Sequence, residues 1–522
     1  MRRDPPTSPA LAALRRRDAL ALMAGAAGAG ALPFGALAQE PPRRGGVLKV
    51  SAATNPSSLD PMTGGSGADH SFLWTIYDTL VEWDYDTLKP KPGLAKWSYP
   101  DPRTMVLDIA PDVAFHDGTP CDAPAVKFNL DRCRDDQRSN VKADLASVSA
   151  VDVTGPLQVT LRLANPDVAL AAIFSDRAGM MVSPKAAQAG AEFDRRPVGA
   201  GPWRFVSWAD NQNMVVKRNE TYWKPSRPYV DGIEFAIIPE IATGLRSVVA
   251  GQNDMVYQVA ARQKPVIDRA KAITAVTHPT LYCHQIYFNT ARPPLDNGKV
   301  RQAINHALDR ESFVKATLGG LGEPATMSLP SSHWAYDKHV SALYPHDPDR
   351  AKTLLAEAGF PNGLDLTIGG YTDQESVRRA EVVLDQLGRA GIRLKFTNGT
   401  IPEISGQFFG AEKKFDALLS AWTGRPDPSM TYSLMFGKGA YYNAGRGEAS
   451  PELTALLAES RASEDLGARA QVFGKIQRIV MERALVAPLA FQFELDALSE
   501  RAKGYRPNLL GKPKFEDVWL KA

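Results

Sequence analysis

Residues 197–239 read PVGAGPWRFVSWADNQNMVVKRNETYWKPSRPYVDGIEFAIIP, and this stretch decides the fold. Large apolar residues alternate with polar ones at period two in three short runs, which predicts strands over 202–208, 214–218 and 233–238. A glycine-bracketed turn precedes the first strand, and polar turns rich in Asp, Asn and Pro separate the three. These residues predict an aromatic-rich antiparallel meander that covers a core, and they include no catalytic pattern.

The order of the motifs in this stretch is more specific than its periodicity. GxGPW is followed by RNxxYW and then by PxxDGIEF, and this order resembles the family 5 extracellular solute-binding proteins of bacterial ABC transporters, which are receptors for peptides, nickel and oligosaccharides. Further matches include FHDG at 115–118, VRQA at 300–303 and AKTLLAEAG at 351–359. The resemblance extends from about residue 45 to residue 522.

The resemblance implies an α/β fold with two lobes, like a type II periplasmic binding protein in the large family 5 form, with an extra subdomain inserted in the first lobe. It places the core of lobe I in residues 39–70, 197–288 and 494–522, the inserted subdomain in 71–196 and lobe II in 289–493. Strands that alternate with helices along the chain independently favour α/β lobes, but local patterns do not predict how the segments interleave.

The first 38 residues have the features of an export signal. Three arginines at 15–17 precede an uncharged run over 19–38, which is rich in Ala and Gly and ends in Ala-Leu-Ala. We expect a signal peptide over 1–38, cleaved near Ala38, and its paired arginines resemble a Tat signal, although the sequence does not choose between the Tat and Sec routes. A membrane anchor is the alternative, because the uncharged run is nearly long enough to span a bilayer. The expected location of the mature protein is the periplasm.

Charge and length set further limits. The whole chain carries 61 Lys and Arg against 58 Asp and Glu, and removing residues 1–38 takes away five Arg and two Asp, which leaves 56 charges of each sign. A balanced charge gives no electrostatic reason to expect nucleic acid or anionic lipid as a partner. The 484 residues that remain exceed one ordinary core, so at least two domains are expected.

Three cysteines are too few for a disulfide scaffold. Cys121 lies just before a predicted helix and Cys133 within its last turns, and the helical rise separates them by roughly 15 Å or more, which exceeds the reach of a disulfide. Buried free thiols are therefore expected, and a bond from Cys283 to either partner is left open.

The sequence carries no recognisable catalytic or metal-binding motif. P-loop, HExxH and GxSxG patterns are missing, and the eight histidines include no i, i+4 pair. His278 and His284 flank Tyr282; a metal site is one interpretation of this arrangement, and satisfied structural imidazoles are the favoured one. We expect no cofactor, no bound metal and no catalytic residue.

The passage SAWTGRPDP at 420–428 is the best candidate for the determinant of specificity. A strand ends in Trp422, and ligands favour such strand ends in α/β lobes. In the peptide receptors that the chain resembles, an aspartate three residues after this tryptophan pairs with the amino terminus of the peptide, whereas this chain has Arg425. Arginine opposes an ammonium group and suits a carboxylate through bidentate hydrogen bonds. The alternative is that Arg425 braces Asp427 or a lobe surface, and Asp427 is interpreted as a turn residue.

The remaining candidates for ligand contact come from the resemblance alone. They are Asn55, Pro56, Ser57, Tyr282, His284 and Trp334. The first three lie in a loop that edges the family's cleft, the next two precede a chain crossing where the family often has cleft aromatics, and the last belongs to the aromatic segment SSHWAY. For each of them a plain loop or ordinary packing is the alternative.

These features predict a periplasmic receptor that closes two lobes over a small solute and presents it to the transmembrane subunits of an ABC permease. The WxGRPDP wording resembles the family members assigned to dipeptide, glutathione or nickel-chelate uptake. The expected solute therefore carries a carboxylate: a short peptide, a modified peptide or an organic-acid metal chelate. A secreted hydrolase with a scattered triad, and a sensor or scaffold that uses the same fold, are the alternatives. We expect a monomer.

Overall fold

A computed structural model of the chain describes residues 40–190, 192–443, 445 and 450–521. The described helices and strands all lie in the unit that spans Pro42–Ala522, called the second unit below. The signal peptide predicted over 1–38 lies outside the described residues. In the described part of the chain, no helix combines the length and the apolar character that a membrane span requires.

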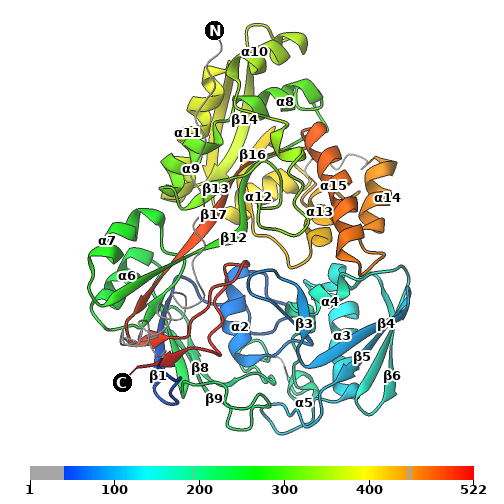
Figure 1. The fold of residues 1–522 in the computed structure, drawn as a ribbon, viewed down its shortest axis with the longest axis vertical. Coiled ribbons are helices and arrows are strands. Elements are labelled where there is room, and N and C mark those ends of the chain that lie inside the picture. Colours follow the sequence, from blue (N-terminus) through cyan, green and yellow to red (C-terminus); the bar gives the residue numbers. More distant parts are fainter. Residues whose placement is uncertain (1–39, 191, 444, 446–449, 522) are drawn as a thin grey trace, which may run out of the picture. The chain divides into compact units, whose positions relative to one another are not determined.

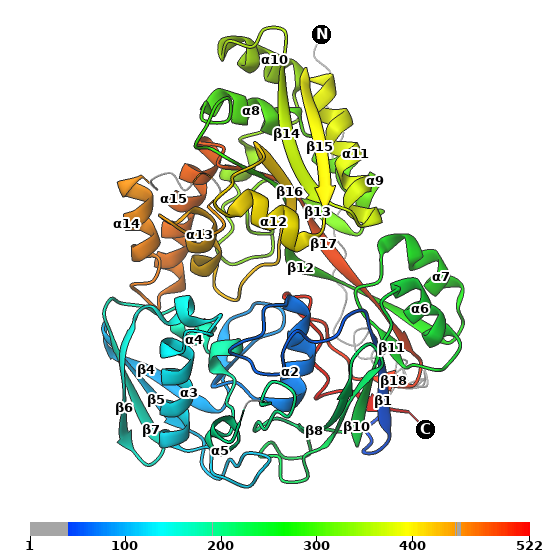
Figure 2. The same cartoon turned by 180° about the vertical axis from the view of Figure 1, so that it is seen from behind.

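One large mixed sheet runs through the second unit, and two long antiparallel strands, β12 (Ile273–Phe288) and β17 (Val486–Ser499), join its halves. Figure 1 and Figure 2 show this pair passing from one half of the sheet to the other. We call β8 to β11 with β1 the first sheet half, and β14 to β16 the second sheet half. The spatial order is β15 (Ile392–Gly399), β14 (Leu364–Tyr371), β16 (Ala417–Trp422), β12, β17, β11 (Met255–Val256), β1 (Val47–Ala52), β10 (Gly232–Ile237), β9 (Asn213–Arg218) and β8 (Trp203–Ala209), with β13 (Gly322–Pro324) paired to β17.

The second sheet half has helices on both faces; its strand β16 is mostly apolar, whereas the edge strand β15 alternates buried and exposed residues. Ile286 and Phe288 of β12 pack in one core, and Tyr287 between them packs in another, because successive strand residues point to opposite faces. The helices of the Ile286 face are α8 (Gly298–Ala307), α9 (Arg310–Leu318), α10 (Pro348–Glu357) and α11 (Gln374–Arg389). The helices of the Tyr287 face are α12 (Ile401–Phe409), α13 (Pro428–Phe436), α14 (Pro451–Glu459) and α15 (Leu466–Glu482).

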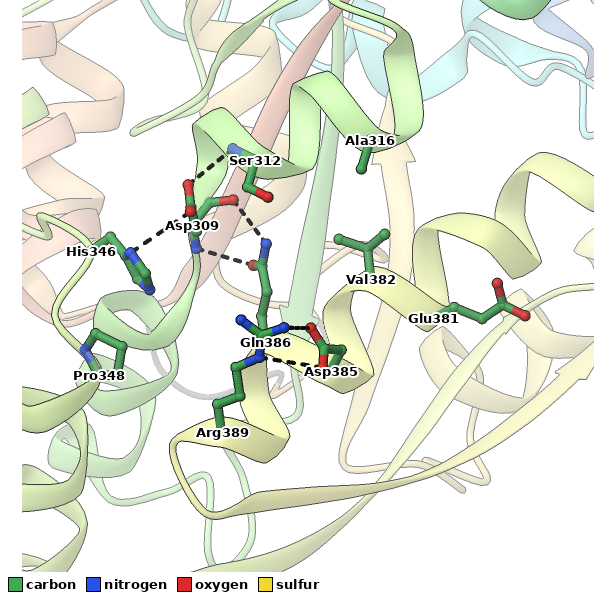
Figure 3. A pocket seen from close by; sticks show the side chains of 10 residues that line it. All are labelled: Asp309, Ser312, Ala316, His346, Pro348, Glu381, Val382, Asp385, Gln386 and Arg389. Atoms are coloured by element: carbon green, nitrogen blue, oxygen red, sulfur yellow. Dashed lines mark hydrogen bonds and ion pairs between the residues drawn. The ribbon is translucent and has the colours of Figure 1, made fainter.

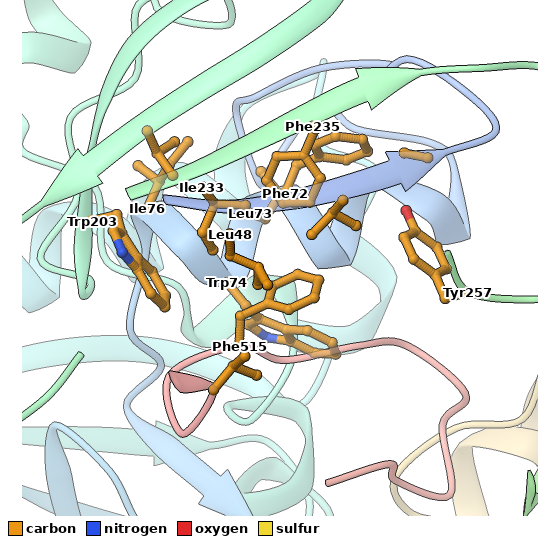
Figure 4. Packing of buried hydrophobic residues seen from close by; sticks show 14 of the residues in the cluster. Leu48, Phe72, Leu73, Trp74, Ile76, Trp203, Ile233, Phe235, Tyr257 and Phe515 are labelled. Carbon is orange, nitrogen blue, oxygen red and sulfur yellow. The ribbon is translucent and has the colours of Figure 1, made fainter. Parts of the chain in front are cut away.

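The first sheet half contains the meander predicted from residues 197–239, and the structure confirms it, since β9 pairs antiparallel with both β8 and β10. Its core joins distant parts of the chain, as Figure 4 shows. The ring of Phe235 in β10 lies 4.6 Å from that of Phe72 in α2 (His70–Ile76) and 5.7 Å from that of Phe515 near the C-terminus. Helices α6 (Ile241–Val249) and α7 (Lys264–Arg269) complete this half.

A separate antiparallel sheet lies beside helix α3 (Ala123–Asp135), as Figure 2 shows. Its strands, in spatial order, are β4 (Ala95–Asp101), β5 (Thr104–Ile109), β7 (Gln158–Leu163) and β6 (Val148–Gly155). The predicted N-cap of α3 is confirmed, because the Asp122 carboxylate accepts a hydrogen bond from the Ala125 amide at 3.1 Å. The smaller elements are β2 (Val81–Trp83), β3 (Pro90–Pro92), α4 (Leu170–Ile173), α5 (Pro184–Gln188), β18 (Ala502–Lys503) and β19 (Trp519–Leu520).

All three cysteines are buried free thiols, as expected, and the bond from Cys283 that was left open does not form.

We predict that replacing Gly201, in the turn before β8, with Ala destabilises the protein by about 1–3 kcal/mol. The added Cβ would lie 2.5 Å from the carbonyl carbon of Ile76, and a backbone atom cannot move aside cheaply. Urea-induced unfolding measures the change. Gly388→Ala is the matched control, because the Gly388 Cα faces open space within α11, where Ala is neutral or stabilising by up to about 1 kcal/mol. Equal stabilities of the two variants would contradict the steric argument.

Candidate functional site

Trp422 closes β16 and forms part of a core. The side chain is only 5 % exposed, and its ring packs edge-on against Tyr442 at 5.3 Å. Its Nε1 group donates a hydrogen bond to the Thr431 hydroxyl of α13 at 3.0 Å. The indole N–H is therefore used inside the protein, and the residue supports the loop that follows it.

That loop turns sharply at Gly424, which has a φ of +75°. A Cβ at this position would lie 2.2 Å from the Cβ of Leu281 in β12, so the close approach of the two segments requires glycine. The turn determines where the next residue, Arg425, projects from the end of the second sheet half.

Asp427 does not pair with Arg425. Its carboxylate accepts two hydrogen bonds of 2.8 Å from Arg469 of α15, and it also caps α13 by accepting from the Ser429 amide. Burial alone would raise the pKa of Asp427, but the Arg469 guanidinium outweighs it and holds that pKa below its ordinary value. The proposed brace between Arg425 and Asp427 is therefore wrong, and Asp427 is more than a turn residue.

Arg425 is half-buried, and among the described residues it has no hydrogen-bond or ion-pair partner. Its positive charge nevertheless influences the pKa of groups from other segments, so the Arg425 side chain lies within electrostatic range of them. These groups are Asp144, Asp176, Tyr442 and Lys512. Burial raises the pKa of Asp144, and the positive charge of Arg425 acts against that increase.

Lys512 is a second cation at this place, contributed by the C-terminal segment. Its ammonium group too lacks a hydrogen-bond or ion-pair partner in the part of the chain that the structure describes. Burial lowers its pKa to about 8; Asp176 opposes this effect and Arg425 adds to it. Asp176 itself is engaged elsewhere, because it contacts the His70 ring at 2.5 Å and accepts from the Arg177 amide. Two cations from distant segments therefore lie near each other with unused donors.

The loop residues Asn55, Pro56 and Ser57 are occupied by contacts within the protein. The Asn55 amide group exchanges hydrogen bonds with Asn211 at 2.7 and 2.9 Å, and Pro56 is buried. Ser57 donates through both its amide and its hydroxyl to the Asp69 carboxylate, at 2.7 Å each. Asp69 also pairs with Arg177, and its negative charge counteracts the lowering of the Lys512 pKa. The loop therefore helps to hold the charged groups near Lys512 in place.

Trp334 packs against the core of the Tyr287 face. Its ring packs edge-on against Phe473 at 5.7 Å, and the Arg469 guanidinium lies over it at 5.4 Å. It thus stabilises the same arginine that binds Asp427.

Tyr282 and His284 lie together in a pocket of about 330 Å³ between the first and second sheet halves, with rings 5.3 Å apart. Burial lowers the pKa of His284 to about 3, so the imidazole is neutral, and it contacts Gln492 at 2.9 Å. Among the described residues, no group of His, Cys, Asp and Glu side chains is arranged to hold a metal ion.

Tyr371, at the end of β14, affects the pKa of a tyrosine in each of the two regions, this pocket and the surroundings of Arg425. Burial raises the pKa of Tyr282 to about 12 and also raises that of Tyr442, and Tyr371 adds to both effects. Its hydroxyl contacts the hydroxyl groups of Ser405 and Ser420 at 2.9 Å each. The two regions are therefore neighbours, and neither Tyr371 nor Lys512 carries a sequence pattern that would have singled it out.

A larger hollow of about 410 Å³ lies elsewhere, among α9, α10 and α11, and contains none of the predicted site residues. Figure 3 shows hydrogen bonds and ion pairs among several of its polar groups, including Asp309, Gln386, Asp385 and Arg389. The Gln386 amide bonds both backbone groups of Asp309, and Asp385 pairs with Arg389. This arrangement joins helices and leaves little for a ligand to satisfy.

The segment before α4 and the segment after α14 also contact each other directly. Arg461, after α14, contacts the Asp167 carboxylate at 3.2 Å, and its carbonyl accepts from the Val168 amide at 2.9 Å. Its Nε group donates to Ser429 at 3.1 Å. This contact links the segment before α4 to the helices of the Tyr287 face.

Comparison with known proteins places this geometry in a family. Residues 89–443, more than half of the chain, match the model of the bacterial extracellular solute-binding proteins, family 5. The glutathione-binding protein GsiB of Escherichia coli O1:K1 is 27% identical over 478 residues, which cover 87% of this chain and 91% of that protein.

Solved structures agree on the fold. The periplasmic binding protein DppA of Helicobacter pylori, in complex with the peptide STSA, has a TM-score of 0.81 at 23% identity, covering 92% of this chain and 99% of its own. A dipeptide-binding protein of Pseudoalteromonas sp. SM9913, in complex with Met-Leu, has a TM-score of 0.79 at 24% identity, covering 92% and 100%. These matches confirm the predicted two-lobed α/β fold class. The chain belongs to the bacterial extracellular solute-binding proteins of family 5.

Proposed function

We propose that this protein captures a small solute with a free carboxylate between its two lobes and delivers it to the permease of an ABC transporter. The observation that carries the proposal is the pair Arg425 and Lys512, whose donors have no partner among the described residues. A half-buried guanidinium without an acceptor is costly, and a ligand carboxylate can accept two parallel hydrogen bonds from it.

The mechanism requires closure and no bond making. Arg425 comes from the end of the second sheet half, and Lys512 comes from a segment packed on the first through Phe515. A carboxylate that contacts both cations binds the closed arrangement more tightly than an open one, and so shifts the population toward closure. The permease then recognises the closed form.

The relatives narrow the class of solute. GsiB is named as a glutathione-binding protein, and two structural neighbours hold the peptides STSA and Met-Leu. We infer that the solute is a short peptide or a peptide-like compound of this size. Native mass spectrometry of the purified protein, which would reveal the mass of a retained solute, tests this inference directly.

We further propose that residues 1–38 are a signal peptide cleaved near Ala38, that the mature protein is a periplasmic monomer, and that the lobes have the boundaries predicted from the sequence. The family's extracellular setting and the periplasmic relative support the location. N-terminal sequencing of the exported protein and its mass in solution test these points.

We also propose that binding is not followed by catalysis. The family and the relatives are binding proteins, and burial raises the pKa of Cys121 and Cys133 to about 12, which leaves these thiols unreactive at neutral pH. Incubation with peptide and ester panels tests this point, since turnover would favour a secreted hydrolase. Unchanged solute uptake after deletion of the gene would favour a sensor or scaffold.

Arg425→Ala is expected to weaken the binding of Met-Leu or glutathione by about 10- to 100-fold, because hydrogen bonds to a charged group contribute about 1.5–3 kcal/mol. Isothermal titration calorimetry measures the change. The control is Arg196→Ala, whose side chain is 80% exposed. Equal affinities of the two variants would remove Arg425 from the site.

The affinity for a carboxylate is expected to fall as the pH rises through about 8. Lys512 is protonated below this value and loses its charge above it, so the attraction is present at neutral pH and lost in alkali. The charged groups that act on Lys512 are Asp69, Asp176, Arg177 and Arg425. N-acetylated Met-Leu is the suitable probe, because it has no amine that titrates. Lys512→Arg should keep its affinity at pH 9, and an identical decline in this variant would assign the pH dependence to another group.

A further inference from the structure

The pocket that holds Tyr282 and His284 contains a buried carboxyl group with no partner. Glu494 of β17 is only 5% exposed and lines this pocket, and no described residue donates a hydrogen bond to its carboxyl group or forms an ion pair with it. The carboxyl group therefore faces the pocket without a partner on the protein, where a ligand can reach it. A bound ligand that supplies a donor would satisfy it.

Three carboxyl groups and one guanidinium line the pocket, those of Asp373, Glu375, Glu494 and Arg379. Arg262 pairs with Glu375, while Arg379 lies 3.9 Å from Asp373 and donates to the Ser376 hydroxyl at 2.9 Å. Among the described residues, Glu494 is the carboxyl group of this lining that has no cationic partner, and an ammonium group on the ligand would provide one.

The geometry favours an ammonium group over a metal ion. No set of ligating side chains among the described residues is arranged for a metal, whereas an ammonium group needs one carboxylate and a few neutral acceptors. Gln258 and Gln492 supply amide oxygens to the lining, and the half-buried ring of Tyr282 offers an aromatic face. His284 is neutral and does not repel a cation.

This pocket and the cationic pair lie on either side of the same short segment. A Cβ on Gly511 would lie 3.1 Å from the Glu494 Cγ, and the next residue is Lys512. Tyr371 contributes to the raised pKa of Tyr282 in the pocket and of Tyr442, on which Arg425 also acts.

We propose that the pocket lined by Tyr282, His284 and Glu494 binds the ammonium end of the solute whose carboxylate contacts Arg425 and Lys512. This inference rests on the proposed function and specifies it: the substrate is a zwitterion that lies with its amine toward β17 and its carboxylate toward the end of β16. The inverted charge at position 425 is then matched by carboxylates at the opposite end of the ligand.

Ligands that differ at one end test the proposal on the unmodified protein. Met-Leu and glutathione are titrated in three forms each: with free termini, with the amine acetylated, and with the carboxylate of the last residue amidated. Acetylation is expected to weaken binding at least tenfold. Equal affinities of the free and acetylated forms would overturn the inference while leaving the proposed function intact. If amidation has no effect, or if no form binds, the proposed function itself fails.

Glu494→Gln assigns the effect to one residue. This variant has the same shape, and it should bind the free peptide only as well as the wild-type protein binds the acetylated one, with no change for the acetylated form. Glu500→Gln, at an exposed position just after β17, is the matched control and should bind all forms normally. An equal loss for both peptide forms would show a structural role for Glu494 and would overturn the proposal.

Proton release gives an independent readout. Burial raises the pKa of Glu494 to about 8, and the charge of Asp496 adds to this, so the carboxyl group is mostly protonated at pH 7 before the ligand binds. Ion pairing with an ammonium group requires the ionised form, so nearly one proton should be released per free peptide bound at this pH. The other titratable groups around Glu494 are Tyr282, His284, Asp373, Glu375, Arg379, Asp496 and Tyr505.

Titration in two buffers with different heats of ionisation measures this release. It should disappear in Glu494→Gln and with the acetylated peptide. Release that persists in the variant would assign the proton to another group in the cleft and would contradict the inference.

Discussion

The antiparallel pairing of β12 with β17 determines how the two sheet halves relate to each other. Each strand is long enough to extend into both sheet halves. The pairing of the two strands runs from Ile273 with Ser499 to Tyr287 with Val486. Because the same two strands serve both halves, the halves can rotate only by bending or twisting this ladder. The candidate ligand groups lie around it, so their separation changes with the same motion.

The groups proposed to bind the ligand lack partners among the described residues, whereas charged groups in the surrounding cores are paired. Asp427 and Arg469 form a buried pair that is complete without a ligand, and Arg461 with Asp167 forms a contact between distant segments. The side chains of Arg425, Lys512 and Glu494 have no hydrogen-bond or ion-pair partner among the described residues, although burial disfavours unpaired polar groups. We propose that a ligand pairs with them and thereby favours the closed arrangement.

Local features were predicted well from the sequence, and long-range partnerships were not. The meander and the Asp122 cap depend on residues within a few positions of each other, so their patterns are readable. The partner of Asp427 lies 42 residues away in α15, and no local pattern indicates it. Trp422 was expected to contact ligand, but its indole N–H is used by Thr431. Lys512 reaches the cleft only because the C-terminal segment folds back onto the first sheet half.

This return of the C-terminal segment has a consequence for biosynthesis. The N-terminal strand β1 pairs with β11, which in turn pairs with β17, and Phe515 fills the core beside Phe235. The interior of the first sheet half is therefore incomplete until β17 and Phe515 have been synthesised. A nascent chain that still lacks these residues exposes the apolar surface that they cover.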